Sequence, residues 1–372
     1  MNITKTTLLR YLIGTVVCAF SAQTISAEGT KLPYWKDIQT VAVNKEAPRT
    51  AFMSYDNSGQ ALTGKYENSP YYKLLNGKWN FYYVDAYKDL PANIEQPGAD
   101  ITWKEINVPG NWEVQGYGTA IYTNQPYDFQ PSNPQPPHLP EANPVGVYQR
   151  DIEIPSNWNG RDIYLRLEGA KSGVYVYLNG KEVGYSEDSK NPAEFLINKY
   201  LQPGKNSLVV KCFRYSTGSY LECQDFWRIS GIERDIYMYA QPQIHLTDFK
   251  AETPLDADYR NGILKLKVKF ANETGKEIPF TVGYRLLNSK DEQIAQSSAR
   301  ASYGQTEVEF TPKTIKEPLQ WTAETPDLYT LVISLKHTNG DVIEATSCKV
   351  GFRTVEIKDK QLMGNGLSLI HI

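Results

Sequence analysis

Two side chains in this sequence carry groups that could recognise hydroxyl groups or a hard cation. The amide of Asn124 offers two donors and an acceptor, which suits hydroxyl groups, although an ordinary turn residue would look the same. The carboxylate of Asp225 can accept a hydrogen bond from a hydroxyl or contribute an oxygen ligand to a cation. A partly buried ion pair with Arg228 or Arg234 is the structural alternative for Asp225.

Several aromatic residues could present flat apolar faces to a ligand. They are Trp112, Tyr122, Tyr127 and Trp227. In strand-rich proteins such residues more often pack in a core, and we expect that for Trp227 in particular. The adjacent carboxylates Glu187 and Asp188 point to opposite faces of an extended chain, so they are not expected to act as a pair.

Composition limits the class of protein. The 372 residues suffice for two or three domains, and 41% are apolar and 12% aromatic, which is typical of a folded, strand-rich chain. The formal net charge is −3, so the chain has no excess of basic residues of the kind that binds nucleic acid or an acidic membrane. A neutral substrate fits this balance better.

The amino terminus is typical of an export signal. A positively charged start, a short apolar stretch over residues 11–20 and small residues up to Ala27 predict a signal peptide over residues 1–27. Its apolar stretch is too short to span a bilayer. Lipidation of Cys18 is the alternative, but the small residues expected before it are missing. We therefore expect a periplasmic or secreted protein with no membrane association.

The cysteines indicate neither a disulfide framework nor a zinc site. Removal of the signal leaves Cys212, Cys223 and Cys348, which cannot all pair within one chain. No CxxC spacing is present. Cys212 lies in an apolar run and is expected to be a small core residue.

Short strand signals separated by turns dominate the chain. The clearest unit is residues 174–178, then Asn179-Gly180, then residues 181–185, because Asn-Gly suits a type I′ turn with positive φ at both positions. Strands this close, without helix-length segments between them, predict antiparallel sheets in a sandwich. We place this first domain at residues 61–245, after an amino-terminal extension over residues 28–60.

A proline-rich insertion interrupts the first domain. Six prolines between residues 131 and 144 block regular secondary structure there. Such a long loop is either functional or a packing arm, and the sequence leaves both open.

A second sandwich is expected over residues 246–355. Leu264, Leu266, Val268 and Phe270 alternate with lysines, which predicts a strand with one dry and one wet face. Asn339-Gly340 predicts another hairpin. The architecture is immunoglobulin-like without the usual buried cysteine pair. The remaining residues 356–372 stop on an apolar run, which indicates a truncation.

Five motifs, in order and spacing, closely resemble the long β-galactosidases of glycoside hydrolase family 2. They are VPGNWE at residues 108–113, IYTN at 121–124, GYSEDSKNPAEF at 184–195, GSYLECQDFWRISGIERDIY at 218–237 and VGFRTVE at 350–356. The proline-rich loop also has a counterpart in that family. The resemblance covers residues 33 to 362 and is specific because the matches keep their order.

The resemblance implies a jelly-roll sugar-binding domain, an immunoglobulin-like sandwich and then a (β/α)8 barrel that carries two catalytic Glu residues. Retaining hydrolysis needs both carboxyls about 5–5.5 Å apart, and a barrel takes roughly 250 residues. Residues 356–372 could hold only its start. The single Asn-Glu pair, Asn272-Glu273, follows a solvated strand. The chain is therefore expected to lack catalytic residues and to be inactive alone.

The resemblance also implies binding roles. Asp225 matches a family residue that helps hold sodium and the galactosyl unit, and Asn124 matches one that hydrogen-bonds the galactosyl ring. Magnesium is expected in the missing barrel, and the full-length enzyme is expected to be a homo-oligomer. Cys223 stands where the family commonly has Asp, which makes the sodium role less secure than the sugar role.

The leading hypothesis is the amino-terminal part of an exported β-galactosidase. The alternatives are a stand-alone carbohydrate-binding protein and a non-catalytic subunit that complements a separate barrel. For the chain alone we expect no sugar binding in a calorimetric titration, because Asn124 and Asp225 would line only part of a pocket. Related family members cleave glucuronides and mannosides.

Overall fold

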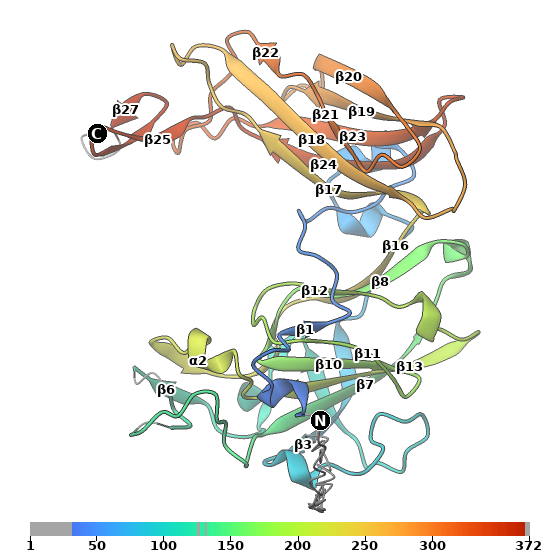
Figure 1. Ribbon diagram of the computed structural model, residues 1–372, viewed down its shortest axis with the longest axis vertical. Helices are drawn as coiled ribbons and strands as arrows, with labels where there is room; N and C mark the ends of the chain where they lie inside the picture. Colours follow the sequence, from blue (N-terminus) through green and yellow to red (C-terminus); the bar gives the residue numbers. More distant parts are fainter. Residues whose placement is uncertain (1–31, 125–126, 131, 369–372) are drawn as a thin grey trace, which may run out of the picture. The chain divides into compact units, whose positions relative to one another are not determined.

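A computed structural model of the protein describes residues 32–124, 127–130 and 132–368 (Figure 1). The predicted signal peptide over residues 1–27 lies outside the described residues. The prediction of an all-β chain is confirmed, and every pair of named strands is antiparallel. No helix among the described residues is long and apolar enough to cross a bilayer.

The first sandwich has two main sheets. The larger has the order β1-β11-β10-β13-β7-β3-β4, with β1 Ala42–Val43, β11 Lys181–Ser186, β10 Gly173–Leu178, β13 Lys205–Phe213, β7 Val145–Glu153, β3 Gly77–Val84 and β4 Lys104–Val108. The smaller has the order β12-β8-β16-β2, with β12 Ala193–Leu196, β8 Asp162–Leu167, β16 Ile236–Gln241 and β2 Tyr72–Leu74. A short sheet of β5 Gly110–Asn111, β15 Gly231–Ile232 and β9 Ala170–Lys171 lies beside them.

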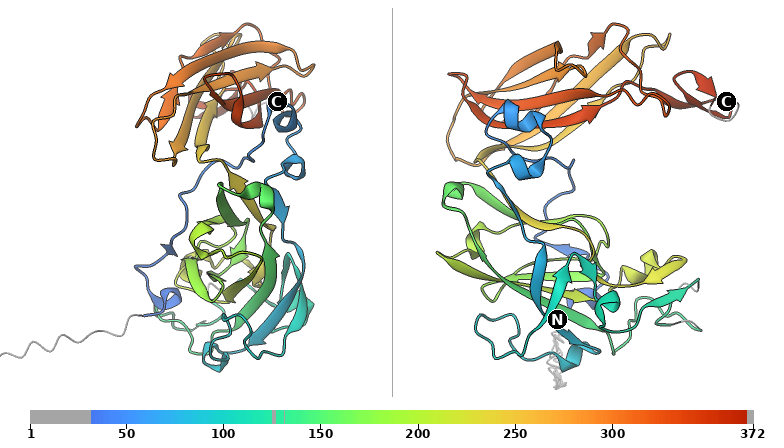
Figure 2. Two further views of the ribbon diagram at one scale, coloured as in Figure 1. Left: turned by 90° about the vertical axis from the view of Figure 1, so that its right-hand side faces the viewer. Right: turned by 180° about the vertical axis from the view of Figure 1, so that it is seen from behind.

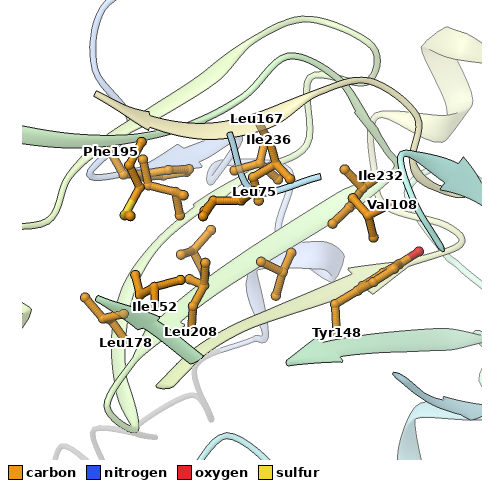
Figure 3. Close-up of a cluster of buried hydrophobic side chains, with 14 of the residues drawn as sticks. Leu75, Val108, Tyr148, Ile152, Leu167, Leu178, Phe195, Leu208, Ile232 and Ile236 are labelled. Carbon is orange, nitrogen blue, oxygen red and sulfur yellow. The ribbon is translucent and has the colours of Figure 1, made fainter. Parts of the chain in front are cut away.

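The core of this sandwich lies between its two main sheets. Figure 3 shows Leu167, Ile236 and Phe195 of the smaller sheet facing side chains of the larger sheet. The facing residues are Ile152, Leu178 and Leu208. All six are almost fully buried, so they contribute the hydrophobic free energy that holds the sheets together. Cys212 is fully buried in the same cluster, as predicted.

The predicted Asn-Gly hairpin is confirmed. Asn179 and Gly180 join β10 to β11 with φ values of 53° and 77°, the combination that a type I′ turn needs. Because such a turn matches the twist of its strands, these two residues fix the register of the pair. β10 then pairs with β13 on its other edge.

The second sandwich follows directly after β16. One sheet holds β17 Ile244–Glu252, β18 Gly262–Asn272, β21 Glu307–Glu309 and β22 Lys313–Ile315. The other holds β20 Gln293–Ala301, β19 Phe280–Leu287, β23 Tyr329–His337 and β24 Val342–Val350. The alternation predicted for β18 is confirmed, because its apolar side chains are buried while Lys265 and Lys269 are exposed.

The described part of the amino-terminal extension packs against both sandwiches. Trp35 is buried against Phe213 of the first sandwich, with ring centroids 5.3 Å apart. Further along, Tyr55 pairs through its backbone with Ala345 of the second sandwich. Helix α1, Ser58–Leu62, follows, and the side chain of Asn57 caps its first turn. Single 3-10 turns occur at Tyr34–Lys36, Tyr66–Asn68, Tyr87–Asp89, Glu113–Gln115, Ser156–Trp158 and Asn198–Tyr200.

The last described residues form a small three-stranded sheet (Figure 2). Its strands are β25 Val355–Lys358, β26 Gln361–Gly364 and β27 Leu367–Ser368. The first two of these strands, β25 and β26, pair as an antiparallel hairpin. The described residues contain no (β/α)8 barrel.

Candidate functional site

A two-stranded ribbon carries both predicted ligand-binding residues. It consists of β6, Ile121–Thr123, and β14, Phe226–Arg228, with Tyr122 directly opposite Trp227. One step further in the same register, Asn124 follows the end of β6 and Asp225 precedes the start of β14. Two residues that are about a hundred positions apart in sequence thus come to the same end of one ribbon. Both are exposed.

The side chains of β14 alternate between solvent and the interior. Trp227 is 52% exposed, whereas Arg228 is only 3% exposed and Phe226 is half-buried. The prediction that Trp227 is a core residue is therefore wrong. In a strand, successive side chains point to opposite faces, and here the covered face is the one occupied by Phe226 and Arg228. Trp112, by contrast, is fully buried.

Tyr122 is linked to Asp225 across the ribbon. Its hydroxyl donates a hydrogen bond of 2.9 Å to Oδ1 of Asp225. This bond to a carboxylate, together with the negative charge itself, raises the pKa of Tyr122 above its usual value. The ring of Tyr122 meets that of Trp227 edge-on, with centroids 5.7 Å apart. Tyr122 therefore contacts both the polar and the aromatic residue of β14's outward face.

Asp225 forms no ion pair with either predicted arginine among the described residues. Arg228 instead lies 3.6 Å from Asp128, which also accepts a 2.6 Å hydrogen bond from Tyr215. Arg228 also donates to the backbone carbonyls of Gln224 and Phe226. These bonds hold the turn before β14, and Asp225 is left facing solvent.

A second buried ion pair supports the base of the ribbon. Arg214 lies 3.4 Å from Glu113 and donates to the backbone carbonyls of Thr119 and Arg228. Burial raises the pKa of Glu113, while the backbone N–H of Ser230 and the charge of Arg214 oppose that shift. Arg214 thus connects the segment before β6 to the end of β14.

A small cavity of about 10 Å³ lies beneath the ribbon, and Lys171, Cys223 and Arg228 are among its lining residues. Burial lowers the pKa of Lys171 and raises the pKa of the Cys223 thiol. Cys223 is free, as are Cys212 and Cys348. A neutral thiol at this position contributes no negative charge beneath the ribbon.

The ribbon alone does not make a complete cation site. No group of three or more His, Cys, Asp or Glu side chains within the described ranges could hold a metal ion. One oxygen of Asp225 accepts from Tyr122, which leaves the other as a ligand for a hard cation. Asp225 therefore fits as one oxygen ligand of a hard cation such as sodium.

The proline-rich loop and the residues just before it pack against α2, Ser219–Glu222, and the Tyr220 hydroxyl donates to the backbone carbonyl of His138. The ring of Phe129 lies 5.2 Å from that of Tyr220, and the Tyr220 hydroxyl donates to Gln130. Asn143 binds the backbone of Tyr215 at the other end of the loop. The described part of the loop contains no helix or strand, as its prolines predicted.

The adjacent carboxylates are separated as predicted. Glu187 is buried and accepts hydrogen bonds from Tyr185 and Thr217, at 3.0 and 2.6 Å. Asp188 is exposed and lies 3.5 Å from Lys45. Sequence reasoning missed the link from Tyr122 to Asp225, because no local signal shows that residues 121–123 pair with residues 226–228.

Two family models together match most of the described chain. The one described as "Glycosyl hydrolases family 2, sugar binding domain" matches residues 72–242, and "Glycosyl hydrolases family 2" matches residues 244–353. The chain belongs to glycoside hydrolase family 2. The two matches correspond to the first and second sandwich of this family 2 chain.

Curated relatives agree with the family. A "Beta-galactosidase" of Priestia megaterium is 37% identical over 352 residues, covering 93% of this chain and 34% of the relative. A "Beta-galactosidase" of Oenococcus oeni is 38% identical over 306 residues, covering 80% of this chain and 29% of the relative. This family 2 chain thus spans about a third of the length of the curated relatives it matches.

Solved structures show the same fold at lower identity. A β-glucuronidase of Bacteroides uniformis aligns with a TM-score of 0.65 and 20% identity, over 80% of this chain and 34% of that one. A β-glucuronidase of Bifidobacterium dentium aligns with a TM-score of 0.61 and 20% identity, over 79% and 50%. Both share the fold of this family 2 chain.

Proposed function

We propose that the chain is the amino-terminal part of an exported β-galactosidase, which hydrolyses terminal β-galactosides with retention. The observation that carries this proposal is the identity of 37% and 38%, over most of the chain, to proteins named β-galactosidase. The β-glucuronidases align at only 20% identity, so they support the fold and not the substrate.

In this proposal the ribbon binds the sugar and does not perform the chemistry. Asn124 hydrogen-bonds hydroxyls of the galactosyl unit, and Asp225 accepts from a further hydroxyl. The acid/base and nucleophilic Glu residues of the proposed enzyme lie in a barrel outside the described residues. Without two carboxyls on either side of the glycosidic bond, the chain alone has no route to retaining hydrolysis.

Two cations belong to the proposal. Sodium, with Asp225 as one ligand, would neutralise carboxylate charge and orient sugar hydroxyls. Magnesium would occupy the barrel. In this chain the role of Tyr122 is to hold one oxygen of Asp225, so that the second oxygen points to the ligand side.

The decisive experiment joins the chain to a barrel. Residues 28–353 are fused to the remaining carboxyl-terminal part of the Priestia megaterium relative, and hydrolysis of p-nitrophenyl β-galactoside is measured. We expect activity that D225N and N124A reduce and that the 372-residue chain alone lacks. Cleavage of the β-glucuronide in preference to the β-galactoside would overturn the substrate assignment.

If the fusion does not fold, a second measurement still tests the proposal. The purified chain is mixed with the separately produced remainder of the relative, and activity is followed over time. Appearance of activity only on mixing would support a complementing subunit, which is the alternative. Galactoside hydrolysis by the chain alone would overturn the proposal that it lacks the catalytic pair.

Export and assembly are tested separately. A host that produces residues 1–372 should deliver the chain outside the cytoplasm, whereas residues 28–372 should stay within it. Light scattering on the active fusion should give a mass above that of one subunit if the enzyme is a homo-oligomer.

A further inference from the structure

The β6–β14 ribbon carries an aromatic pair that belongs to neither core. Tyr122 is 58% exposed and Trp227 is 52% exposed, and neither is part of a buried cluster. Among the chain's tryptophans, all of which the structure describes, Trp227 alone is exposed. Burial of apolar area contributes about 25 cal/mol per Å², so a ligand that covers this exposed pair gains binding free energy.

The aromatic pair and the polar pair share one face of the ribbon. Asn124 lies two residues beyond Tyr122, and Asp225 two residues before Trp227, and side chains two apart in a strand point the same way. The hydrogen bond from Tyr122 to Asp225 confirms this common face, because the bond runs diagonally across the ribbon. Two residues along a strand span about 6.6 Å, comparable to one pyranose ring.

The opposite face is fixed to the body of the first sandwich. The ring of Phe226 lies beneath the charges of Lys171 and Lys190, at 5.0 and 5.2 Å from its centroid. Arg228 is buried against Asp128. The outward side chains therefore stand on a supported strand, which limits the entropy lost on binding.

We propose that the outward face of this ribbon is a two-part sugar-binding strip, in which Trp227 and Tyr122 bind the group attached to the anomeric carbon of the galactoside. Asn124 and Asp225 form its galactosyl end, so the inference rests on the proposed function and extends it. The ligand of the aromatic end is a flat apolar surface, either an aryl group or the C–H face of a second pyranose.

The bond between Tyr122 and Asp225 makes the two ends one unit. The ring of Tyr122 contacts the ring of Trp227 edge-on, and the hydroxyl of Tyr122 donates a hydrogen bond to Asp225. In the proposal this same carboxylate binds a galactosyl hydroxyl. In this proposal a galactosyl unit seated on Asp225 has its aglycone on the Trp227 side of the ribbon. Aromatic packing contributes about 0.5–1.5 kcal/mol beyond buried area, which corresponds to about a 2- to 12-fold gain in affinity.

The test uses the full 372-residue chain with ¹⁵N-labelled indoles. The Trp227 signal is assigned by comparison with W227F, and phenyl β-galactoside, methyl β-galactoside and phenyl β-glucuronide are titrated. We expect millimolar binding, too weak for calorimetry. Phenyl β-galactoside should move the Trp227 signal at about 2- to 12-fold lower concentration than methyl β-galactoside. D225N should weaken the response to both galactosides.

Leu221 on α2 supplies the matched control, because it is 85% exposed and lies outside the ribbon. L221A should leave every titration unchanged. A Trp227 signal that no sugar moves, or that phenyl β-galactoside moves equally in D225N, would overturn the strip while leaving the proposed function intact. If phenyl β-glucuronide moves the Trp227 signal as strongly as phenyl β-galactoside does, the sugar-binding strip is supported, but the assignment of galactosides as the substrate is wrong.

The other possible occupant of this face is the barrel itself. In the active fusion, W227A should raise KM for phenyl β-galactoside more than for methyl β-galactoside, with L221A unchanged. If W227A instead lowers the yield of folded fusion and leaves both KM values equal, the ribbon is an interdomain contact and the inference is wrong.

Discussion

Arg49, in the segment before the first sandwich, binds Glu194 of β12 at two points: Nε to Oε1 and Nη2 to Oε2, each at 3.0 Å. Arg166 donates to the same carboxylate at 2.9 Å, and all three side chains are buried. Burial alone would raise the pKa of Glu194, but the two guanidinium groups outweigh it and lower the pKa.

Among the described residues, replacing Glu194 by Gln leaves Arg49 without a carboxylate partner and leaves Arg166 paired only with Glu168. We expect E194Q to lower the free energy of unfolding by about 3–5 kcal/mol at pH 7, measured by urea unfolding. The pKa of Glu194 is lower in the folded state than in the unfolded state. The stabilisation by its ion pairs is therefore complete above pH 4.5 and is lost as the pH falls through the folded-state pKa. E182Q, at an exposed position of β11, should change little. A loss below 1 kcal/mol for E194Q would contradict the pairing.

Glu187 should show the opposite pH dependence. Burial raises its pKa, against hydrogen bonds from Thr217 and Tyr185, so the folded state binds the proton more tightly than the unfolded state. Its contribution to stability therefore falls as the pH rises from 4.5 through the folded pKa. E187Q should flatten the stability profile over that window, in urea titrations at several pH values. D188N, at the exposed neighbour, is the control, and an unchanged slope in E187Q would count against the buried carboxylate.

The pKa of Tyr122 reports its bond to Asp225. D225N removes the charge that raises this pKa, so the value should move down toward the ordinary one. The ¹³Cζ signals of labelled tyrosines measure it, with Y122F for assignment. Tyr259, whose pKa is raised by its hydrogen bond to Glu356, should titrate identically in both proteins. An equal pKa for Tyr122 in D225N would show that the bond is absent in solution.

Gly146 on β7 has no room for a methyl group. A Cβ there would lie 2.5 Å from a ring carbon of Trp112 and 2.8 Å from Phe81. We expect G146A to cost about 1–3 kcal/mol of stability through overpacking. G283A on β19 is the matched control, because its nearest contact is an ordinary 3.4 Å. Equal stability of the two variants in thermal unfolding would mean that the Trp112 pocket can expand.

Local signals predicted the sandwiches well. Asn179-Gly180 determines its own turn, and the alternation along β18 determines its own buried face, since both depend only on neighbouring residues. The ribbon could not be derived in this way. Which face of β14 is covered depends on the packing of Phe226 and Arg228 against Lys171 and Asp128, residues far away in the sequence. The site residues Asn124 and Asp225 came from family resemblance, and their meeting required the pairing of distant strands.

The early segment that pairs with the second sandwich has a consequence for the order of events during synthesis. The Ser347 hydroxyl binds the backbone carbonyl of Ala61, a partner 286 residues away. At about 5–20 residues per second, the ribosome needs roughly 15–60 s to supply that partner. Throughout this interval the second sandwich is not available to α1, so α1 completes its packing only after the strands around Ser347 have been synthesised.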